Sequence, residues 1–228
     1  MDPKKAAALK ALEYTADGMT IGLGTGSTSI HFIDGLGEKV RQFGWRVRGV
    51  PTSERSRLQA QNLGISIVDL SDVRELDLAI DGADEADRNL SLIKGGGGAL
   101  LREKLVAAAA RRFIVVCDSS KLKETLGAFP LPVAIVPFGW AGTSARLEKF
   151  GVECRLRENA DRPGDPYVTD DGLHIIDMRF GTIEDPKDLE MELKRITGVV
   201  DVGLFVGLAS RLILGFEDGH TEEIDGSR

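Results

Sequence analysis

Cysteine, aromatic side chains and long apolar runs are scarce in this 228-residue sequence. It contains two cysteines, and aromatic residues make up 6% of it. Cys117 and Cys154 lie far apart in apolar, strand-like runs without paired metal-ligand spacing, so we expect reduced core thiols. No run reaches the roughly 18 apolar residues of a transmembrane helix, and Lys10 and Glu13 interrupt any signal-like segment at the N-terminus. The sequence predicts a cytoplasmic protein with no membrane partner.

Basic residues are also outnumbered by acidic ones, with 29 Lys and Arg against 36 Asp and Glu. The formal net charge is −7, and no basic run is longer than a pair. This balance argues against a nucleic-acid partner. A phosphorylated ligand would therefore have to be held locally, by glycine amides, hydroxyl groups and one or two lysines.

The signatures of several enzyme classes are missing. The histidines, at positions 31, 174 and 220, have no partner at metal-ligand spacing. There is no nucleophile elbow and no Cys/His pair, which disfavours acyl hydrolysis. The glycine-rich corner at 22–28 has Ser27 where a dinucleotide fingerprint needs its third glycine, and no Gly-Lys-Ser/Thr loop is present. A small phosphate ester fits this corner better than a nucleotide.

Strands and helices alternate through the first 130 residues. This order predicts a mainly parallel, Rossmann-like α/β sheet with right-handed crossovers. Strands are expected at 19–23, 45–51, 65–70, 76–80 and 113–118, and helices at 4–15, from about 27, at 52–64 and at 99–110. The first helix would bury a stripe of Ala7, Leu9, Leu12 and Tyr14.

The pattern changes near residue 130, where three prolines punctuate the chain. Residues 132–206 follow the order β-α-β-β-α-β of a ferredoxin-like fold, with 161–166 as a loop between its middle strands. The apolar run at 212–216 predicts a strand that rejoins the first sheet. We therefore expect a Rossmann-like catalytic domain, 1–130 plus 207–228, and an inserted smaller α+β domain, 131–206, with an oligomerisation role.

Chemical groups concentrate in residues 81–103. Asp81 should emerge from the carboxyl end of a buried strand, where open α/β sheets bind ligands. Lys94 precedes four glycines, which allow close approach of backbone to a ligand, and Glu103 follows inside a helix. The alternative is a solvated acidic turn with a flexible loop, and Glu103 alone would be typical of an exposed helix face. The acidic residues at the start of this stretch, within 81–87, are Asp81, Asp84, Glu85 and Asp87.

Taken together, these groups are suited to proton transfer. Burial and clustered like charges raise the pKa of a carboxylate towards neutrality, which makes it a competent base at a carbon acid. Asp81 and Asp84 could then hold different protonation states. Lys94 and the amides of residues 95–98 could stabilise a developing enediolate oxygen.

Four motifs, in this order and at these separations, closely resemble the type A ribose-5-phosphate isomerases. They are GTGST at 24–28, DGADE at 81–85, KGGGGALLREK at 94–104 and DSSK at 118–121, and the resemblance covers nearly the whole chain. It implies interconversion of D-ribose 5-phosphate and D-ribulose 5-phosphate in the pentose phosphate pathway. It also implies a homodimer or homotetramer and no metal or organic cofactor.

The resemblance further implies roles for individual residues. Glu103 would be the general base, Asp81 and Asp84 would bind sugar hydroxyls and assist ring opening, and Lys94 would stabilise the oxyanion. Lys4 would lie near the phosphate, although Lys5 beside it leaves the register open. The implied substrate-binding residues are Thr25, Gly26, Ser27, Thr28, Gly82, Ala83, Gly95, Gly96, Gly97, Lys121 and Lys4. One departure from the resemblance lies in SRLILG at 210–215, where Arg211 occupies a position at which a smaller or acidic residue is expected.

Two other functions remain open on the sequence. A sugar-phosphate-sensing module would bind without turnover, although no basic helix-turn-helix segment accompanies it here. An acyl-CoA transferase with a glutamate nucleophile would form a covalent thioester, which an isomerase would not.

Overall fold

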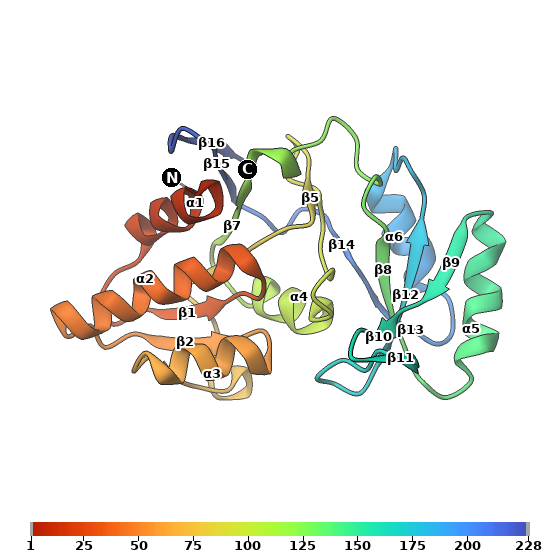
Figure 1. Ribbon diagram of the computed structural model, residues 1–228, viewed down its shortest axis with the longest axis horizontal. Coiled ribbons are helices and arrows are strands. Elements are labelled where there is room, and N and C mark those ends of the chain that lie inside the picture. Colours follow the sequence, from red (N-terminus) through yellow and green to blue (C-terminus); the bar gives the residue numbers. More distant parts are fainter. Residues whose placement is uncertain (1, 227–228) are drawn as a thin grey trace.

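A seven-stranded, mainly parallel sheet forms the larger part of the molecule (Figure 1). The computed structural model describes residues 2–226. The strand order is β16-β15-β7-β4-β1-β2-β3, and only the β15–β16 pair is antiparallel among these described strands. The strands are β1 Thr20–Leu23, β2 Arg48–Pro51, β3 Ser66–Ile67, β4 Leu78–Asp81, β7 Phe113–Asp118, β15 Arg211–Gly215 and β16 Thr221–Asp225.

Both faces of this sheet are buried. In β4, Leu78 and Ile80 pack into one core cluster and Ala79 into the other. Because successive side chains of a strand point to opposite faces, a strand covered on both sides reads as a continuous apolar run. The helices are α1 Pro3–Ala11, α2 Ser27–Phe43, α3 Glu54–Asn62 and α4 Leu100–Ala108. The predicted fold class is confirmed.

The helix ends follow local sequence chemistry. The Ser53 side chain accepts a hydrogen bond from the Ser56 amide (3.2 Å), so Ser53 rather than Thr52 caps α3. In α1 the expected stripe is partly wrong, because Leu9 is exposed and alanines 7, 8 and 11 make the contact with the core. Short 3₁₀ helices occupy Leu12–Tyr14, Leu70–Asp72, Ser119–Lys121 and Glu148–Phe150.

A second, antiparallel sheet builds the smaller unit, with the order β13-β8-β12-β9. Numbered along the chain this order is 4-1-3-2, which suits the expected ferredoxin-like connectivity. The unit has its own core, which includes Leu147, Ile176 and Leu193. Its elements are β8 Leu131–Ile135, α5 Trp140–Leu147, β9 Glu153–Leu156, β12 His174–Arg179, α6 Pro186–Lys194 and β13 Val199–Val202.

One loop expectation in this unit is wrong. Instead of an irregular loop at 161–166, β10 Glu158–Asn159 and β11 Arg162–Pro166 form an antiparallel hairpin. The hairpin is largely exposed and holds two prolines and a glycine, so it carries no apolar alternation that could have indicated a strand.

A small three-stranded sheet, ordered β14-β6-β5, joins the two units. Its strands are β5 Glu85–Ala86, β6 Leu92–Ile93 and β14 Leu204–Phe205. Leu92 and Phe205 pack into the core of the larger unit, while Ile93 and Leu204 pack into that of the smaller one. This sheet therefore fixes the segment from Asp84 to Lys94 between the two cores.

The C-terminal tail forms β16, an edge strand of the larger sheet. Arg211 lies within 2.6 Å of a carboxylate oxygen of both Glu223 and Asp225, and it also contacts the Tyr14 hydroxyl. Arg211 thus ties the C-terminal strand to the 3₁₀ helix that follows α1.

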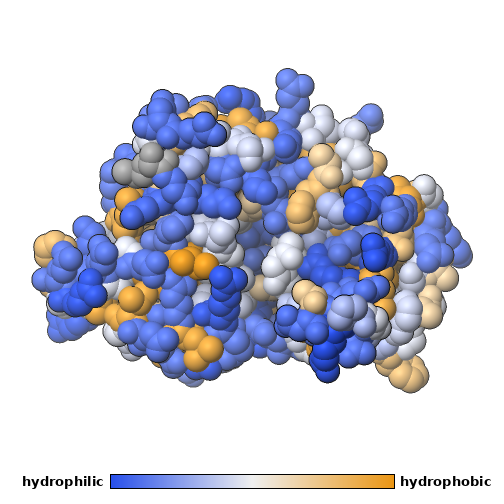
Figure 2. All heavy atoms as spheres, viewed as in Figure 1, coloured by the Kyte–Doolittle hydropathy of each residue, from blue (hydrophilic) through white to orange (hydrophobic). Residues whose placement is uncertain are grey.

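The visible face of the molecule in Figure 2 is mostly hydrophilic, with apolar residues scattered among polar ones. Within residues 2–226, no helix combines the length and the apolar character needed to cross a membrane.

Candidate active site

A cleft lies at the carboxyl ends of β1, β4 and β7, where an open parallel sheet places its ligands. Every substrate-binding residue expected from the sequence lines it, as do three of the four expected catalytic residues. The lining consists of Lys4, Thr25, Gly26, Ser27, Thr28, Gly82, Ala83, Asp84, Lys94, Gly95, Gly96, Gly97, Glu103, Cys117, Asp118 and Lys121.

The corner after β1 presents unpaired donors to this cleft. Helix α2 begins at Ser27, and no side chain in the described part of the chain caps its first turn. The amides of that turn are therefore free for an anion, and the hydroxyls of Ser27 and Thr28 lie beside them. Thr25 turns its hydroxyl to Thr52 and Ser53 instead, at 2.7 Å from each, and so braces the corner against α3.

Asp81 lies beneath the cleft rather than in its lining. Its side chain is almost wholly buried, and Oδ1 accepts hydrogen bonds from the Thr25 amide (2.9 Å), the Gly82 amide (2.7 Å) and Ser29 Oγ (3.1 Å). Oδ2 lies 3.1 Å from Lys94 Nζ. The carboxylate therefore ties the first corner to the lysine.

Lys94 occupies the centre of the site and is only 2% exposed. Its Nζ donates to the Gly82 carbonyl at 2.5 Å, lies 3.5 Å from Glu103 Oε1 and stands over the Phe205 ring. Burial by itself would lower the pKa of Lys94, but Asp81 and Glu103 outweigh it and raise the pKa. The side chain is thus held as an ammonium ion.

Glu103 lies in the first turn of α4 with 5% of its surface exposed, so the solvated-face alternative is wrong. Its Oε2 atom is buried and has no hydrogen-bond partner within residues 2–226. Burial raises the pKa of Glu103 to about 8, against the attraction of Lys94, and the nearby Asp81 and Asp84 charges add to the rise. A buried carboxyl in the lining of a cleft, with one oxygen free of hydrogen bonds and a raised pKa, is equipped to exchange a proton.

The glycine loop, residues 95–98, forms the wall opposite the first corner. The Gly96 amide donates to Asp84 Oδ2 at 2.7 Å. Gly95 and Gly98 adopt positive φ angles of 102° and 84°. A Cβ at Gly98 would lie 2.2 Å from the Tyr167 hydroxyl, so this turn needs glycine for both its conformation and its close packing.

The other two acids of the cluster do not belong to the cleft. Glu85 accepts hydrogen bonds from the Gly127 and Phe129 amides, both at 2.7 Å. Asp87 accepts hydrogen bonds from the Asn89 and Ser91 amides and so shapes a turn. Both are structural.

Two lining residues were not among the expected site residues: Cys117, expected as a core thiol, and Asp118, which belongs to the DSSK motif. Burial raises the pKa of the Cys117 thiol to about 12, so it stays neutral. Asp118 shapes the following turn by accepting a hydrogen bond from the Ser120 amide (3.1 Å). Their position at the end of β7 was the available signal, because β7 is a third strand that delivers polar groups to the same edge.

The two N-terminal lysines differ in position. Lys4 lines the cleft, whereas Lys5 is exposed and does not. Lys121, on the turn after β7, brings a further cation. No group of three or more His, Cys, Asp or Glu side chains in residues 2–226 is placed to hold a metal ion.

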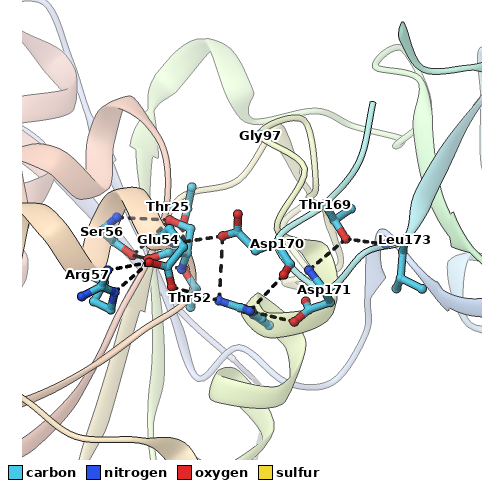
Figure 3. Close-up of polar contacts among 12 residues, drawn as sticks. Thr25, Thr52, Glu54, Ser56, Arg57, Gly97, Thr169, Asp170, Asp171 and Leu173 are labelled. Atoms are coloured by element: carbon cyan, nitrogen blue, oxygen red, sulfur yellow. Dashed lines mark hydrogen bonds and ion pairs between the residues drawn. The ribbon is translucent and has the colours of Figure 1, made fainter. Parts of the chain in front are cut away.

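A loop of the smaller unit, residues 167–173, closes over α3 and α4 beside the cleft (Figure 3). Asp170 Oδ2 accepts a hydrogen bond from the Glu54 amide at the start of α3 (2.9 Å). Arg102 Nε donates to Asp171 Oδ1 at 2.8 Å. The neighbour of Glu103 on α4 thus faces away from the cleft and links the two units.

Comparison with known proteins gives one consistent result. The model of the family described as ribose 5-phosphate isomerase A (phosphoriboisomerase A) matches residues 48–219. The ribose-5-phosphate isomerase A proteins of Parvibaculum lavamentivorans and Methanothermobacter thermautotrophicus are 51% and 46% identical, each over 96% of both chains.

Solved structures agree. A D-ribose-5-phosphate isomerase in complex with phospho-erythronic acid superposes with a TM-score of 0.94 at 40% identity, covering 99% of this chain and 100% of that one. The ribose 5-phosphate isomerase A of Methanocaldococcus jannaschii gives 0.92 at 38% identity, over 97% of both chains.

An open parallel sheet with a buried carboxyl and ammonium pair at its ligand-binding edge, in a chain with these relatives, defines an aldose-ketose isomerase. The chain belongs to the ribose 5-phosphate isomerase A family.

Proposed function

We propose that the protein interconverts D-ribose 5-phosphate and D-ribulose 5-phosphate through an enediolate, with Glu103 as the general base. The observation that carries this proposal is the buried carboxyl of Glu103 in the cleft lining, with Oε1 3.5 Å from the Lys94 ammonium and Oε2 without a hydrogen-bond partner among residues 2–226. Such a carboxyl can remove a proton from carbon, because desolvation makes it a stronger base than an exposed glutamate.

In the forward direction, Glu103 takes the C2 proton of the open-chain aldose. The electron pair of that bond forms the C1–C2 double bond, and the π pair of the C1 carbonyl moves to O1, which gives the enediolate. The same carboxyl then returns the proton to C1. The hydroxyl proton leaves O2 and O1 gains one, so atoms and charges balance. A single base can serve both carbons because they are adjacent.

Lys94 would stabilise the negative charge that develops on the enediolate oxygen, together with the amides of the glycine loop. Asp84, which lines the cleft, would contact the sugar hydroxyls and assist ring opening. Asp81 would support the proton exchange between O1 and O2 through Lys94, since the lysine lies between it and the cleft.

The phosphate would lie at the first turn of α2, with Ser27, Thr28, Lys4 and Lys121 around it. This arrangement combines unpaired amides, hydroxyls and two cations in a protein whose overall charge is negative. Local donors therefore replace a general attraction for anions.

We also propose that residues 1–130 plus 207–228 form the catalytic domain and that 131–206 serve oligomerisation, as a homodimer or homotetramer. The exposed apolar side chains of Val136, Phe138 and Trp140 on the smaller unit support this role, and Phe138 is 94% exposed. Pentose phosphate metabolism supports a cytoplasmic location.

The test is to incubate the purified, EDTA-treated protein with D-ribose 5-phosphate and to measure D-ribulose 5-phosphate. Glu103→Gln should keep the fold and bind the sugar phosphate, while turnover falls by about 10²–10⁴-fold. Near-normal turnover of Glu103→Gln would show that Glu103 is not the general base. Failure of the EDTA-treated wild-type protein to form D-ribulose 5-phosphate would contradict the proposed metal-free isomerase function.

A further inference from the structure

Arg157, at the end of β9 in the smaller unit, reaches across to the glycine loop. Its Nη1 donates to the carbonyl oxygens of Gly95 (2.8 Å) and Gly96 (3.2 Å). The rest of the guanidinium is held by Asp177, through Nε to Oδ2 at 2.9 Å and Nη2 to Oδ1 at 2.5 Å. Arg157 does not line the cleft.

This contact fixes the direction of the loop amides. All peptide bonds of the described residues are trans, so the N–H of each residue points away from the carbonyl before it. With the Gly95 carbonyl turned to Arg157, the Gly96 N–H points the opposite way, and it does donate to Asp84 on the cleft wall. The side opposite Arg157 is therefore the cleft side.

The same geometry applies to the next peptide. The Gly96 carbonyl also faces Arg157, so the Gly97 N–H points towards the cleft. No residue within 2–226 accepts a hydrogen bond from this amide, and Gly97 is exposed. It is an unpaired donor in the cleft that Lys94 also lines, and such a donor can stabilise a developing oxyanion.

Glycine has the largest conformational freedom of any residue, so a run of four needs external restraints to hold one shape. A guanidinium that is fixed by a bidentate carboxylate is a rigid restraint, because its donors lie in one plane. Tyr167, whose amide donates to the Arg157 carbonyl (2.8 Å), packs its hydroxyl against Gly98 from the same side.

We propose that Arg157, held by Asp177, is a positioning residue that aims the Gly97 amide at the reacting oxygen of the substrate. The smaller unit thereby contributes to the chemistry without touching the substrate. This role rests on the proposed isomerase function.

The experiment compares Arg157→Gln with Arg102→Gln. Arg102 is a matched control, because it also links the two units, while its hydrogen bonds and ion pairs in the described part of the chain go to Glu54, Asp170 and Asp171 rather than to the glycine loop. Arg157→Gln should lower kcat by about 10–100-fold with little change in KM, since a small misplacement of a donor affects the transition state most. Arg102→Gln should keep kcat within about twofold.

Three further measurements separate positioning from folding. Inhibition by inorganic phosphate should be unchanged in Arg157→Gln, because the phosphate corner lies on α2. Hydrogen exchange of residues 94–99 should become faster in Arg157→Gln and in Asp177→Asn but not in Arg102→Gln. Arg157→Lys should recover part of kcat, since one ammonium can reach one carbonyl but cannot pair bidentately with Asp177.

Equal loss of kcat in Arg157→Gln and Arg102→Gln, or unchanged exchange of the loop in Arg157→Gln, would overturn the positioning role. If Arg157→Gln does not fold, Asp177→Asn and Arg157→Lys carry the same comparison. A wild-type protein without isomerase activity would contradict the proposed function alone, because the exchange measurement does not depend on turnover.

Discussion

Lys94 Nζ lies 3.5 Å from Glu103 Oε1, and both side chains are buried. Asp81 shares the same ammonium from the other side. Two carboxyl groups therefore compete for one cation in a site that water hardly reaches. Among residues 2–226, Asp81 Oδ2 and Glu103 Oε2 both lack a hydrogen-bond partner, but of the two residues only Glu103, the proposed base, lines the cleft.

The first prediction concerns the pH dependence of catalysis. Because burial raises the pKa of Glu103 to about 8, most of this carboxyl is protonated at pH 7 and cannot act as a base in the free enzyme. kcat/KM should therefore rise with pH and level off above an apparent pKa near 8. A steady-state pH profile for ribose 5-phosphate isomerisation measures it, and a flat profile from pH 6 to 9 would contradict it.

Lys94→Met supplies the control for this profile. The positive charge of Lys94 lowers the pKa of Glu103, against the larger effect of burial. Removing that charge should move the midpoint of whatever activity remains to higher pH. A midpoint that stays in place would show that another group controls the profile.

The second prediction concerns stability. The pKa of Glu103 is about 8 in the folded protein and close to the ordinary value of 4.5 when unfolded. Between these values the folded state binds the extra proton, so the free energy of unfolding should fall as pH rises, by up to about 1.4 kcal/mol per pH unit. The contribution of Glu103 protonation to the free energy of unfolding is fully present below about pH 4.5 and is lost above about pH 8.

Urea unfolding of the wild-type protein and of Glu103→Gln at several pH values measures this effect. The difference in unfolding free energy between the two proteins should change with pH in favour of Glu103→Gln as pH rises, because glutamine does not titrate. A difference that is constant from pH 5 to 8 would show that Glu103 is ionised throughout.

Residues at strand ends were predictable from the sequence. Asp81, Thr25 and Lys121 each follow an apolar run, and parallel strands bring such positions to one edge of a sheet whatever the details of packing. The sequence did not indicate that Asp81 lies beneath the cleft while Asp84 lines it. That difference depends on the turn after β4, which the short pairing of β5 with β6 determines.

The joining sheet and Arg157 could not be predicted for a related reason. Strands of two residues show no periodicity, and β14 pairs with β6 across more than a hundred positions. Arg157 sits in an exposed-looking run of alternating charges, and only the packing of the two units brings it to the glycine loop.

The third prediction separates the two N-terminal lysines. Lys4→Gln should raise KM for ribose 5-phosphate by about tenfold, because it removes the charge-assisted contact that we propose between Lys4 and the phosphate. Lys5→Gln removes the same charge from the adjacent, exposed position and should leave KM unchanged. Steady-state kinetics at low and high salt measure both, and equal effects of the two changes would mean that only general electrostatic attraction is at work.

The fourth prediction tests how closely β1 and β4 must approach. A Cβ on Gly24 would lie 2.1 Å from Asp81 Oδ1 and 2.6 Å from the Asp81 Cα atom. The second contact is with backbone, so no side-chain rotation relieves it. Gly24→Ala should push the two strand ends apart, lower the free energy of unfolding by about 1–3 kcal/mol and reduce kcat by at least about tenfold, because the Asp81–Lys94 pair moves.

Gly142→Ala is the control for the glycine substitution itself. Its nearest neighbour would be Arg146 Nη1 at 3.7 Å, and the position lies inside helix α5. Here alanine should raise the free energy of unfolding by about 0.5–1 kcal/mol and leave kcat unchanged. Wild-type kcat in Gly24→Ala would mean that the strand ends can separate without disturbing Lys94, and the role of Asp81 as its anchor would then be wrong.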